Sequence, residues 1–250
     1  MTASDNFNIH EFLDHISLDC VVFGFNENEL KVLLLHLKYT KEYALPGGFL
    51  KKEETLEDAA KRVLKERTGL DNIFLKQFNV FSDPERSKTN KAIQDIIQSG
   101  SNPDVEFFSK RFISVGFYAL VDFTKVKPTP DFFSDRCEWK NLKENIPYLL
   151  DHKQIISEAL GVLRLQLNHQ PIGFNLLPKK FTMPELQNLY ETILGKQLDR
   201  RNFQRKILSY KILNKLQERK TGGAYKSPFF YEFNLERYQQ SLEKGLSGNW

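Results

Sequence analysis

Residues 45–70 place the tightest limits on how this chain folds. Pro46-Gly47-Gly48 interrupts regular structure, because proline lacks an amide donor and glycine costs backbone entropy inside an element. Between Glu53 and Thr68 the apolar residues recur at helical spacing, and Gly69 stands where a helix C-cap is expected. The stretch therefore predicts a sharp turn followed by one amphipathic helix, whose apolar positions are Leu56, Ala59, Ala60, Val63 and Leu64.

Strand patterns lie on both sides of this helix. Leu18–Phe25 and Leu30–Leu37 are rich in β-formers, and the polar Asn26–Glu29 between them predicts a hairpin. Further strands are expected at Phe74–Phe81 and Arg111–Phe123. The segment between them, Ser87–Lys110, is interpreted as an insertion in a loop. The alternation predicts an α+β domain, sandwich-like, ending near Tyr148.

Helical signals dominate the rest of the chain. His152–Leu167 is an amphipathic helix, either a linker packed on its own domain or a dimerisation element. Thr182 and Glu185 have the spacing of a capping box, with Phe181 and Leu186 as its hydrophobic staple. That helix stops at Gly195, and Asp199 caps a second one that runs to about Tyr210.

After the second helix, Gly222-Gly223 turns the chain toward Phe229, Tyr231 and Phe233, which alternate as in a strand. Helix, glycine-containing turn, helix and then a β-hairpin is the order of a winged helix-turn-helix. With 250 residues the chain has room for two domains. We expect an N-terminal domain at 1–150, a linker or dimerisation helix at 151–170 and a winged helix at 171–250.

Charge differs between these parts. The chain carries a net +4, but residues 151–250 hold 16 Lys and Arg against 9 Asp and Glu, a balance of +7. Residues 1–150 hold 20 against 23, a balance of −3. The basic part predicts an anionic partner, although solvated basic faces are common.

Targeting, membrane and metal signals are weak. The polar start is unlike a signal peptide, and the long apolar runs, such as Val32–Leu35, are strand-sized. Cys20 and Cys137 stand far apart without metal-ligand spacing. We expect a cytoplasmic protein with reduced thiols, no metal, no cofactor and no membrane contact.

The spacing between Gly48 and Leu70 resembles the Nudix box. The matching residues are Gly48, Glu54, Arg62, Leu64, Glu66, Gly69 and Leu70. Val63 and Arg67 stand where the box has glutamates. Positions 63, 66 and 67 share a helix face that gathers metal-binding carboxylates in Nudix hydrolases. Here the formal charge of that face falls from −3 to zero, so we expect no catalytic residues and no hydrolysis.

Glu54, Asp58, Arg62 and Glu66 repeat every four residues. We expect Arg62 to pin the loop carrying Glu54, and Glu66, by ion pairs, which is a structural role. The Nudix-like α/β/α sandwich would then keep its cavity without its chemistry, as a sensor does.

Nearly the whole chain resembles the Nudix-related transcriptional regulators, which fuse a Nudix-like domain to a C-terminal winged helix-turn-helix; the Ser87–Lys110 insertion departs from that family's compact form. That family includes repressors of NAD metabolism and regulators of arabinose and related sugar use. The resemblance implies a homodimer on a palindromic double-stranded DNA operator, controlled by a small-molecule effector in the Nudix domain. It rests on Leu18–Phe25, Leu45–Phe49, Phe81–Pro84, Ser114–Leu120, Leu150–His152, Phe174–Pro178 and Leu198–Phe203.

A transcriptional repressor controlled by a metabolite is therefore the leading function. Loss of metal-binding character favours a neutral sugar such as arabinose over an NAD-related nucleotide as effector. A Nudix hydrolase acting on ADP-ribose-like substrates is the alternative, and a protein-binding adaptor is a third. Candidate effector-binding residues are His36, Glu54, Arg62, Glu66, Asp83 and Arg86.

The second helix of the helix-turn-helix is the expected DNA reader. Phe203, Ile207 and Tyr210 share one face, so Arg201 and Arg205 point away from the core. Arginine suits guanine edges and phosphates, whereas Asn and Gln suit adenine. The predicted DNA-binding residues are Arg200, Arg201, Asn202, Gln204, Arg205 and Lys206 on the helix, with Arg219, Lys220 and Lys226 in the wing.

Overall fold

The computed structural model describes residues 8–38, 40–71, 73–87, 107, 110–167, 173–220 and 227–244. The chain divides into two compact units. The first comprises residues 1–23, 31–120 and 125–159; the second comprises residues 24–30, 121–124 and 160–250. Most of the Ser87–Lys110 insertion and the Gly222-Gly223 turn lie outside the described residues. No helix in the described ranges is both long enough and apolar enough to span a membrane.

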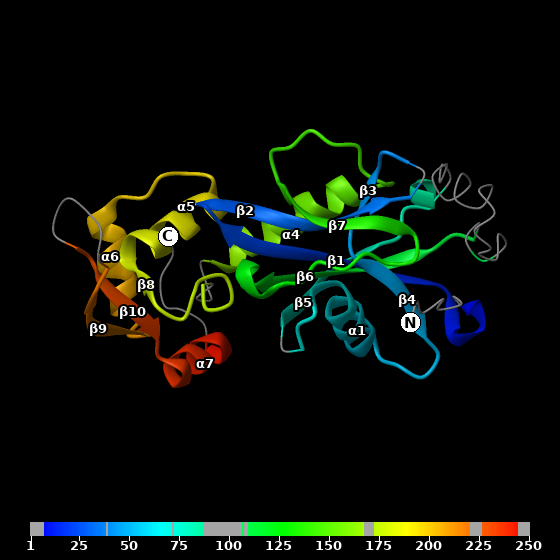
Figure 1. The fold of residues 1–250 in the computed structure, drawn as a ribbon. Helices are drawn as coiled ribbons and strands as arrows, with labels where there is room; N and C mark the ends of the chain where they lie inside the picture. The colour runs from blue at the N-terminus through cyan, green and yellow to red at the C-terminus, as the bar shows by residue number, and fades with distance from the viewer. Residues whose placement is uncertain are drawn as a thin grey trace. The chain divides into compact units, whose positions relative to one another are not determined.

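A seven-stranded sheet forms the centre of the N-terminal domain (Figure 1). Its strand order is β3-β2-β1-β6-β5, with β4 paired to β1 and β7 paired to β2. The helices α1 (Leu56–Thr68) and α4 (His152–Gln166) lie on the two sides of this sheet (Figure 1). The strands are β1 (Phe12–Asn26), β2 (Glu29–Leu37), β3 (Tyr43–Ala44), β4 (Gly47–Lys51), β5 (Phe74–Phe81), β6 (Ile113–Val121) and β7 (Ser134–Asn141). Short 3₁₀ turns are η1 (Ile9–Glu11), η2 (Pro84–Ser87) and η3 (Phe123–Lys125).

The structure confirms the predicted hairpin and helix, with shifted boundaries. Glu27 and Asn28 join β1 to β2 with φ of 53° and 60°, the left-handed pair that suits a two-residue hairpin turn. The helix begins at Leu56 rather than Glu53, because the Thr55 side chain accepts from the Asp58 amide and caps it. Strand β7 was not predicted, and it carries several charged residues on a half-exposed edge.

The winged-helix region is built as predicted. Helix α5 (Met183–Leu194) starts with the Thr182–Glu185 capping box and ends at Gly195, whose φ is 69°. Asp199 caps α6 (Arg200–Ser209) through the Asn202 amide. A three-stranded sheet follows in the order β8-β10-β9, made of β8 (Phe181–Thr182), β9 (Leu213–Arg219) and β10 (Phe229–Phe233). A last helix, α7 (Leu235–Lys244), was not predicted.

A buried polar network centres on Asp19 of β1. Arg86, with 4% of its side chain exposed, donates to both Asp151 oxygens at 2.8 and 2.9 Å and reaches Asp19 at 3.4 Å. The Ser114 hydroxyl donates to Asp19 at 2.5 Å. His152 Nδ1 accepts from the Leu45 amide at 2.9 Å, and its Nε2 lies 3.6 Å from Asp19. The network joins β1, β6, the turn after β5 and the start of α4.

The Leu45–Gly48 turn is pressed against the sheet by this network. The Cys20 amide donates to the Pro46 carbonyl at 2.7 Å, and Asp19 pairs with Gly47 in the β1–β4 register. A Cβ on Gly47 would lie 2.7 Å from the Leu18 carbonyl oxygen. Only glycine fits there, so the turn requires glycine at position 47 because the two backbones pack closely.

We expect Arg86→Met to lower the free energy of unfolding by about 3–5 kcal/mol, because Asp19 and Asp151 would stay buried without their cation. Urea unfolding followed by circular dichroism measures this. Adding Asp151→Asn to Arg86→Met should recover part of the loss, since one uncompensated charge is removed. Full stability in Arg86→Met would contradict a structural role for the network.

We also expect Gly47→Ala to destabilise the domain by about 1–3 kcal/mol, because its new methyl group meets backbone oxygen. Gly161→Ala is the matched control: it lies inside α4, and a Cβ added there would have nothing within 4 Å. That change should be neutral or stabilise by up to about 1 kcal/mol, since alanine favours helices. Equal thermal midpoints for the two variants would refute the close approach at Gly47.

Candidate DNA-binding and effector sites

Helix α6 turns its charged side chains outward. Phe203 and Ile207 are buried, and the Phe203 ring packs edge-on against Tyr190 at 5.4 Å. Tyr210 is half-buried, and burial raises the pKa of its hydroxyl. The predicted core face of the helix is thereby confirmed. The opposite face exposes Arg201 and Arg205, flanked by the exposed Asn202 and the half-buried Gln204. The exposed Arg200 and the half-buried Lys206 lie nearer the buried side of the helix.

One hydrogen bond organises this exposed face. The Arg205 guanidinium donates to Asn202 Oδ1 at 2.9 Å, so the two side chains present a joined set of donors. The backbone amide of Asn202 donates to Oδ1 of the capping Asp199 at 2.9 Å. Arginine and asparagine can each form paired hydrogen bonds with a base edge in the major groove. The exposed face of α6 therefore carries side chains that can form hydrogen bonds with specific bases.

The described wing residues are held by contacts inside their own domain. Arg219 donates to the Ser227 carbonyl at 3.0 Å and lies over the Phe229 ring at 3.8 Å. Lys220 donates to Glu185 Oε1 at 2.7 Å, while Thr182 donates to Glu185 Oε2. Burial opposes ionisation of Glu185, but Lys220 and Thr182 outweigh it and lower the pKa of that carboxyl. Lys220 thus fastens the wing to the start of α5.

Sequence reasoning missed Lys215, whose ammonium lies over the same Phe229 ring at 3.7 Å. Strand alternation was the available signal, because residues 215 and 219 of β9 face the same side. The pair makes an exposed basic and aromatic surface on the wing. The third predicted wing residue, Lys226, lies outside the described residues.

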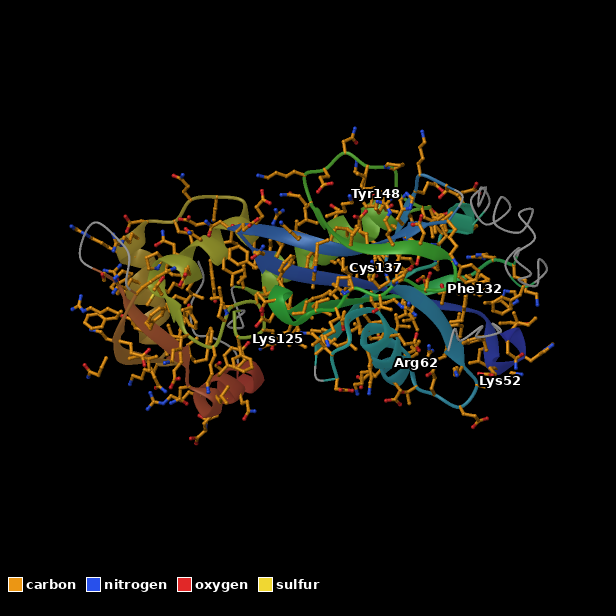
Figure 2. The ribbon with its side chains drawn as sticks, in the orientation of Figure 1. Lys52, Arg62, Lys125, Phe132, Cys137 and Tyr148 are labelled. Atoms are coloured by element: carbon orange, nitrogen blue, oxygen red, sulfur yellow. The ribbon has the colours of Figure 1, made fainter. Side chains whose placement is uncertain are left out.

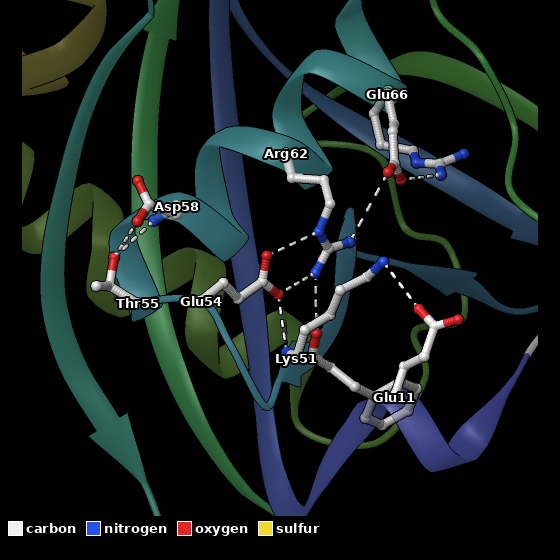
Figure 3. A network of polar contacts seen from close by, with 9 residues as sticks. Glu11, Lys51, Glu54, Thr55, Asp58, Arg62 and Glu66 are labelled. Atoms are coloured by element: carbon white, nitrogen blue, oxygen red, sulfur yellow. Dashed lines mark hydrogen bonds and ion pairs between the residues drawn. The ribbon is translucent and has the colours of Figure 1, made fainter.

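In the Nudix-like box, Arg62 binds the loop that precedes its helix (Figure 3). It donates to both Glu54 oxygens at 3.1 and 2.6 Å and to the Phe49 carbonyl at 3.1 Å. The Lys51 amide also donates to Glu54 at 2.8 Å. Burial opposes the ionised form, but Arg62 and Lys51 outweigh it and lower the pKa of Glu54. The predicted loop-pinning role of Arg62, which projects from α1 (Figure 2), is confirmed.

Asp58, which shares the four-residue spacing of Glu54, Arg62 and Glu66, belongs to the helix cap. That carboxylate accepts from the Thr55 hydroxyl at 2.7 Å, while its amide donates back to Thr55 at 3.2 Å (Figure 3). The reason is the position of the helix start: Asp58 is the third helical residue, where it closes the cap instead of reaching Arg62.

The face that carries metal ligands in Nudix enzymes holds Val63, Glu66 and Arg67. Val63 is buried, and its Cγ2 lies 3.0 Å from the position of a Cβ on Gly48. Glu66 Oε2 accepts from Arg67 at 2.9 Å, and Glu66 Oε1 lies 3.8 Å from Arg62 Nη1. Its one carboxylate therefore has an arginine on each oxygen.

These residues do not fit a divalent cation. Magnesium prefers several hard oxygen ligands, and Val63 offers none. A guanidinium about 4 Å away would repel each unit of metal charge by about 4 kcal/mol at an effective dielectric of 20. Among the described residues, no group of three or more His, Cys, Asp and Glu side chains could hold a metal ion. The box thus keeps its architectural residues and lacks the donor set for metal.

The six predicted effector-binding residues do not lie together. Glu54, Arg62 and Glu66 belong to the box, and Arg86 belongs to the buried network. His36 Nδ1 shares a hydrogen bond of 2.7 Å with Asp135 on the β2–β7 side of the sheet, and its ring packs against Tyr43. Asp83 binds the Glu85 amide at 2.8 Å and shapes the turn before Arg86. The structure therefore places the six residues in separate polar clusters rather than in one.

Sequence reasoning missed other polar residues near them. The Arg86 network is completed by four residues that were not predicted as site residues: Asp19, Ser114, Asp151 and His152. All four lie in segments on which the family resemblance rests, namely Leu18–Phe25, Ser114–Leu120 and Leu150–His152. Tyr43 donates to Glu138 at 2.8 Å, and Lys140 lies 4.9 Å from the Tyr43 ring. These contacts join residues at least 65 positions apart, so no local pattern marks them.

Comparison with known proteins matches both halves of the chain. The NUDIX domain family matches residues 14–158, and the NrtR DNA-binding winged helix domain family matches residues 173–233. The "ADPR responsive transcriptional repressor NtrR" of Acinetobacter baylyi is 25% identical over 238 residues, covering 92% of this chain and 86% of that protein. The "ADP-ribose pyrophosphatase" of Methanocaldococcus jannaschii is 37% identical over 75 residues, covering 29% of this chain and 44% of that protein.

A solved structure shares the fold over both domains. Shewanella oneidensis NrtR complexed with a 27mer DNA superimposes with a TM-score of 0.74 at 22% identity, covering 95% of this chain and 100% of that chain. The order of Nudix domain and winged helix predicted from the sequence is therefore confirmed. The chain belongs to the Nudix family, and its C-terminal part is an NrtR-type DNA-binding winged helix domain.

Proposed function

We propose that this protein is a DNA-binding transcriptional repressor whose Nudix domain binds ADP-ribose as its effector. The support is the likeness over both domains to a repressor described as ADPR responsive. ADP-ribose replaces the arabinose-type sugar predicted from the sequence, and this corrects that prediction. Loss of metal ligands had favoured a neutral ligand, but arginines can also attract a diphosphate. A homodimer on a palindromic operator belongs to the same proposal.

The observation that carries the proposal is that the Nudix box has lost two metal-binding carboxylates while the residues that shape the fold around it are kept. Arg62, Glu54 and the glycines still shape the turn and α1, whereas Val63 and Arg67 remove two of three carboxylates. Hydrolysis of a diphosphate by Nudix chemistry requires those carboxylates to hold metal and activate water. A domain that folds around its ligand without cleaving it suits a sensor. We therefore include the absence of hydrolysis in the proposal.

ADP-ribose should change the affinity of the protein for its operator, and arabinose should not. Fluorescence anisotropy with labelled DNA from the promoter of the protein's own operon measures both. A differential effect of tenfold corresponds to about 1.4 kcal/mol of coupling between the two sites. Unchanged DNA affinity at saturating ADP-ribose, in a protein that calorimetry shows to bind it, would sink the effector assignment.

Arg201→Ala or Arg205→Ala should each cost about 1–3 kcal/mol of operator binding, because each removes a base-reading or phosphate-binding guanidinium. The sequence preference should relax where the lost arginine reads a base. The control is Lys61→Ala/Lys143→Ala, which removes two exposed charges from the Nudix domain. Retained affinity and preference in a folded Arg201→Ala/Arg205→Ala protein would show that α6 does not read DNA.

A hydrolase acting on ADP-ribose is the second candidate. The 75-residue match to an ADP-ribose pyrophosphatase favours it, as does the retained Glu66, 46% of whose side chain is exposed. Magnesium-dependent release of AMP from ADP-ribose, abolished by Glu66→Gln, would decide for this candidate. The same assay without turnover in a protein that binds ADP-ribose would decide for the repressor.

A further inference from the structure

We infer that Arg67 takes the place of the Nudix metal ion, so that this domain binds its diphosphate ligand without a divalent cation. The identity of the ligand rests on the proposed function. The exclusion of the cation rests on the contacts of α1 alone.

Glu66 is already paired with two cations. Arg67 Nη2 donates to its Oε2 at 2.9 Å. Arg62 Nη1 lies 3.8 Å from its Oε1 (Figure 3). Arg62 is in turn held by Glu54 at 2.6 Å. A metal ion approaching Glu66 would have to displace one guanidinium and lie beside the other. The only carboxylate left at the three ligand positions of the box is therefore neutralised.

Arg67 is fixed in place. Its side chain is 12% exposed, and its Nη1 reaches the Thr129 carbonyl at 3.4 Å. The backbone reinforces this contact, because the Thr129 amide donates to the Arg67 carbonyl at 3.1 Å and the Lys127 amide donates to the Thr68 carbonyl at 2.9 Å. The guanidinium is held between its own helix and this loop, so its charge stays beside Glu66.

The Arg67 guanidinium also keeps a donor unused. Its Nε is buried without a hydrogen-bond partner in the described part of the chain. Protein acceptors thus leave one donor of the group unmatched, which is uncommon for a buried polar atom. Arginine binds phosphate oxygens through several parallel donors and keeps its charge at every accessible pH. It can attract a diphosphate as a metal ion does, but it cannot lower the pKa of a bound water.

The test is calorimetric titration of the full-length protein with ADP-ribose, in EDTA and in magnesium. The wild-type dissociation constants should agree within about twofold. Arg67→Glu should weaken binding in EDTA by about tenfold or more, as expected for loss of a charge-assisted contact. Magnesium should restore part of that loss, because residues 66 and 67 would then both be carboxylates. Lys61→Glu makes the same charge change on the exposed side of α1 and should leave both constants unchanged.

A dissociation constant at least tenfold weaker in EDTA than in magnesium for the wild type would overturn the inference. So would unchanged EDTA affinity in Arg67→Glu. If Arg67→Glu fails to fold by circular dichroism, Arg67→Gln replaces it, and the same loss of EDTA affinity is expected.

Manganese titration followed by electron paramagnetic resonance tests the exclusion of the cation without any nucleotide. The wild type should show no site that Glu66→Gln removes, whereas Arg67→Glu should gain one. A wild-type manganese site abolished by Glu66→Gln would overturn the inference. Failure of ADP-ribose to bind under every condition would refute the proposed function, and this titration would still decide on Arg67.

Discussion

The ion pair of Arg86 with Asp151, shared with Asp19, is the contact on which the Nudix domain depends. Three charged groups are buried or partly buried there, and burial of charge is tolerable only when partners satisfy each group. Each partner comes from a different part of the chain: Ser114 from β6, His152 from α4 and the Leu45 amide from the turn. A shift of any one strand would leave a charge unpaired, so the network selects a single arrangement of the sheet, the turn and α4.

The turn passes that arrangement on to the box. Gly47 packs against β1, Gly48 packs against Val63, and Arg62 binds both Glu54 and the Phe49 carbonyl. Most of the residues that match the Nudix pattern hold this shape or lie in the helix that it positions. Of the three carboxylate positions, two have been replaced by residues that add packing or a clamp on residue 129. The metal ligands of the Nudix box can be lost without loss of the fold, because different side chains of α1 hold the loop and occupy the ligand positions.

The features that could be predicted from the sequence are those that depend on neighbouring residues. The Thr182–Glu185 capping box, the Asp199 cap, the left-handed Gly69 and Gly195 and the Glu27–Asn28 hairpin all follow from contacts within about four positions. Long-range contacts were not predictable in this way. The Arg86 network joins residues 65–133 positions apart. Strand β7 was missed because its backbone pairs with the distant β2, and its Asp135 and Glu138 bond to His36 and Tyr43, which no local pattern identifies.

The structure also gives the basic surplus of the C-terminal part a location. Charge alone does not identify a DNA-binding surface, because folding uses many cations for its own contacts. Lys220 holds Glu185, Lys180 holds Glu218, and Arg164 donates to the Ile193 carbonyl at 2.7 Å. On α6, by contrast, the buried face is apolar and the arginines lie on the exposed side, where packing within the domain does not require them. The exposed arginines of α6 are available to an anionic partner. Lys220 and Arg219 in the wing differ from them, because contacts within the domain already hold these two side chains.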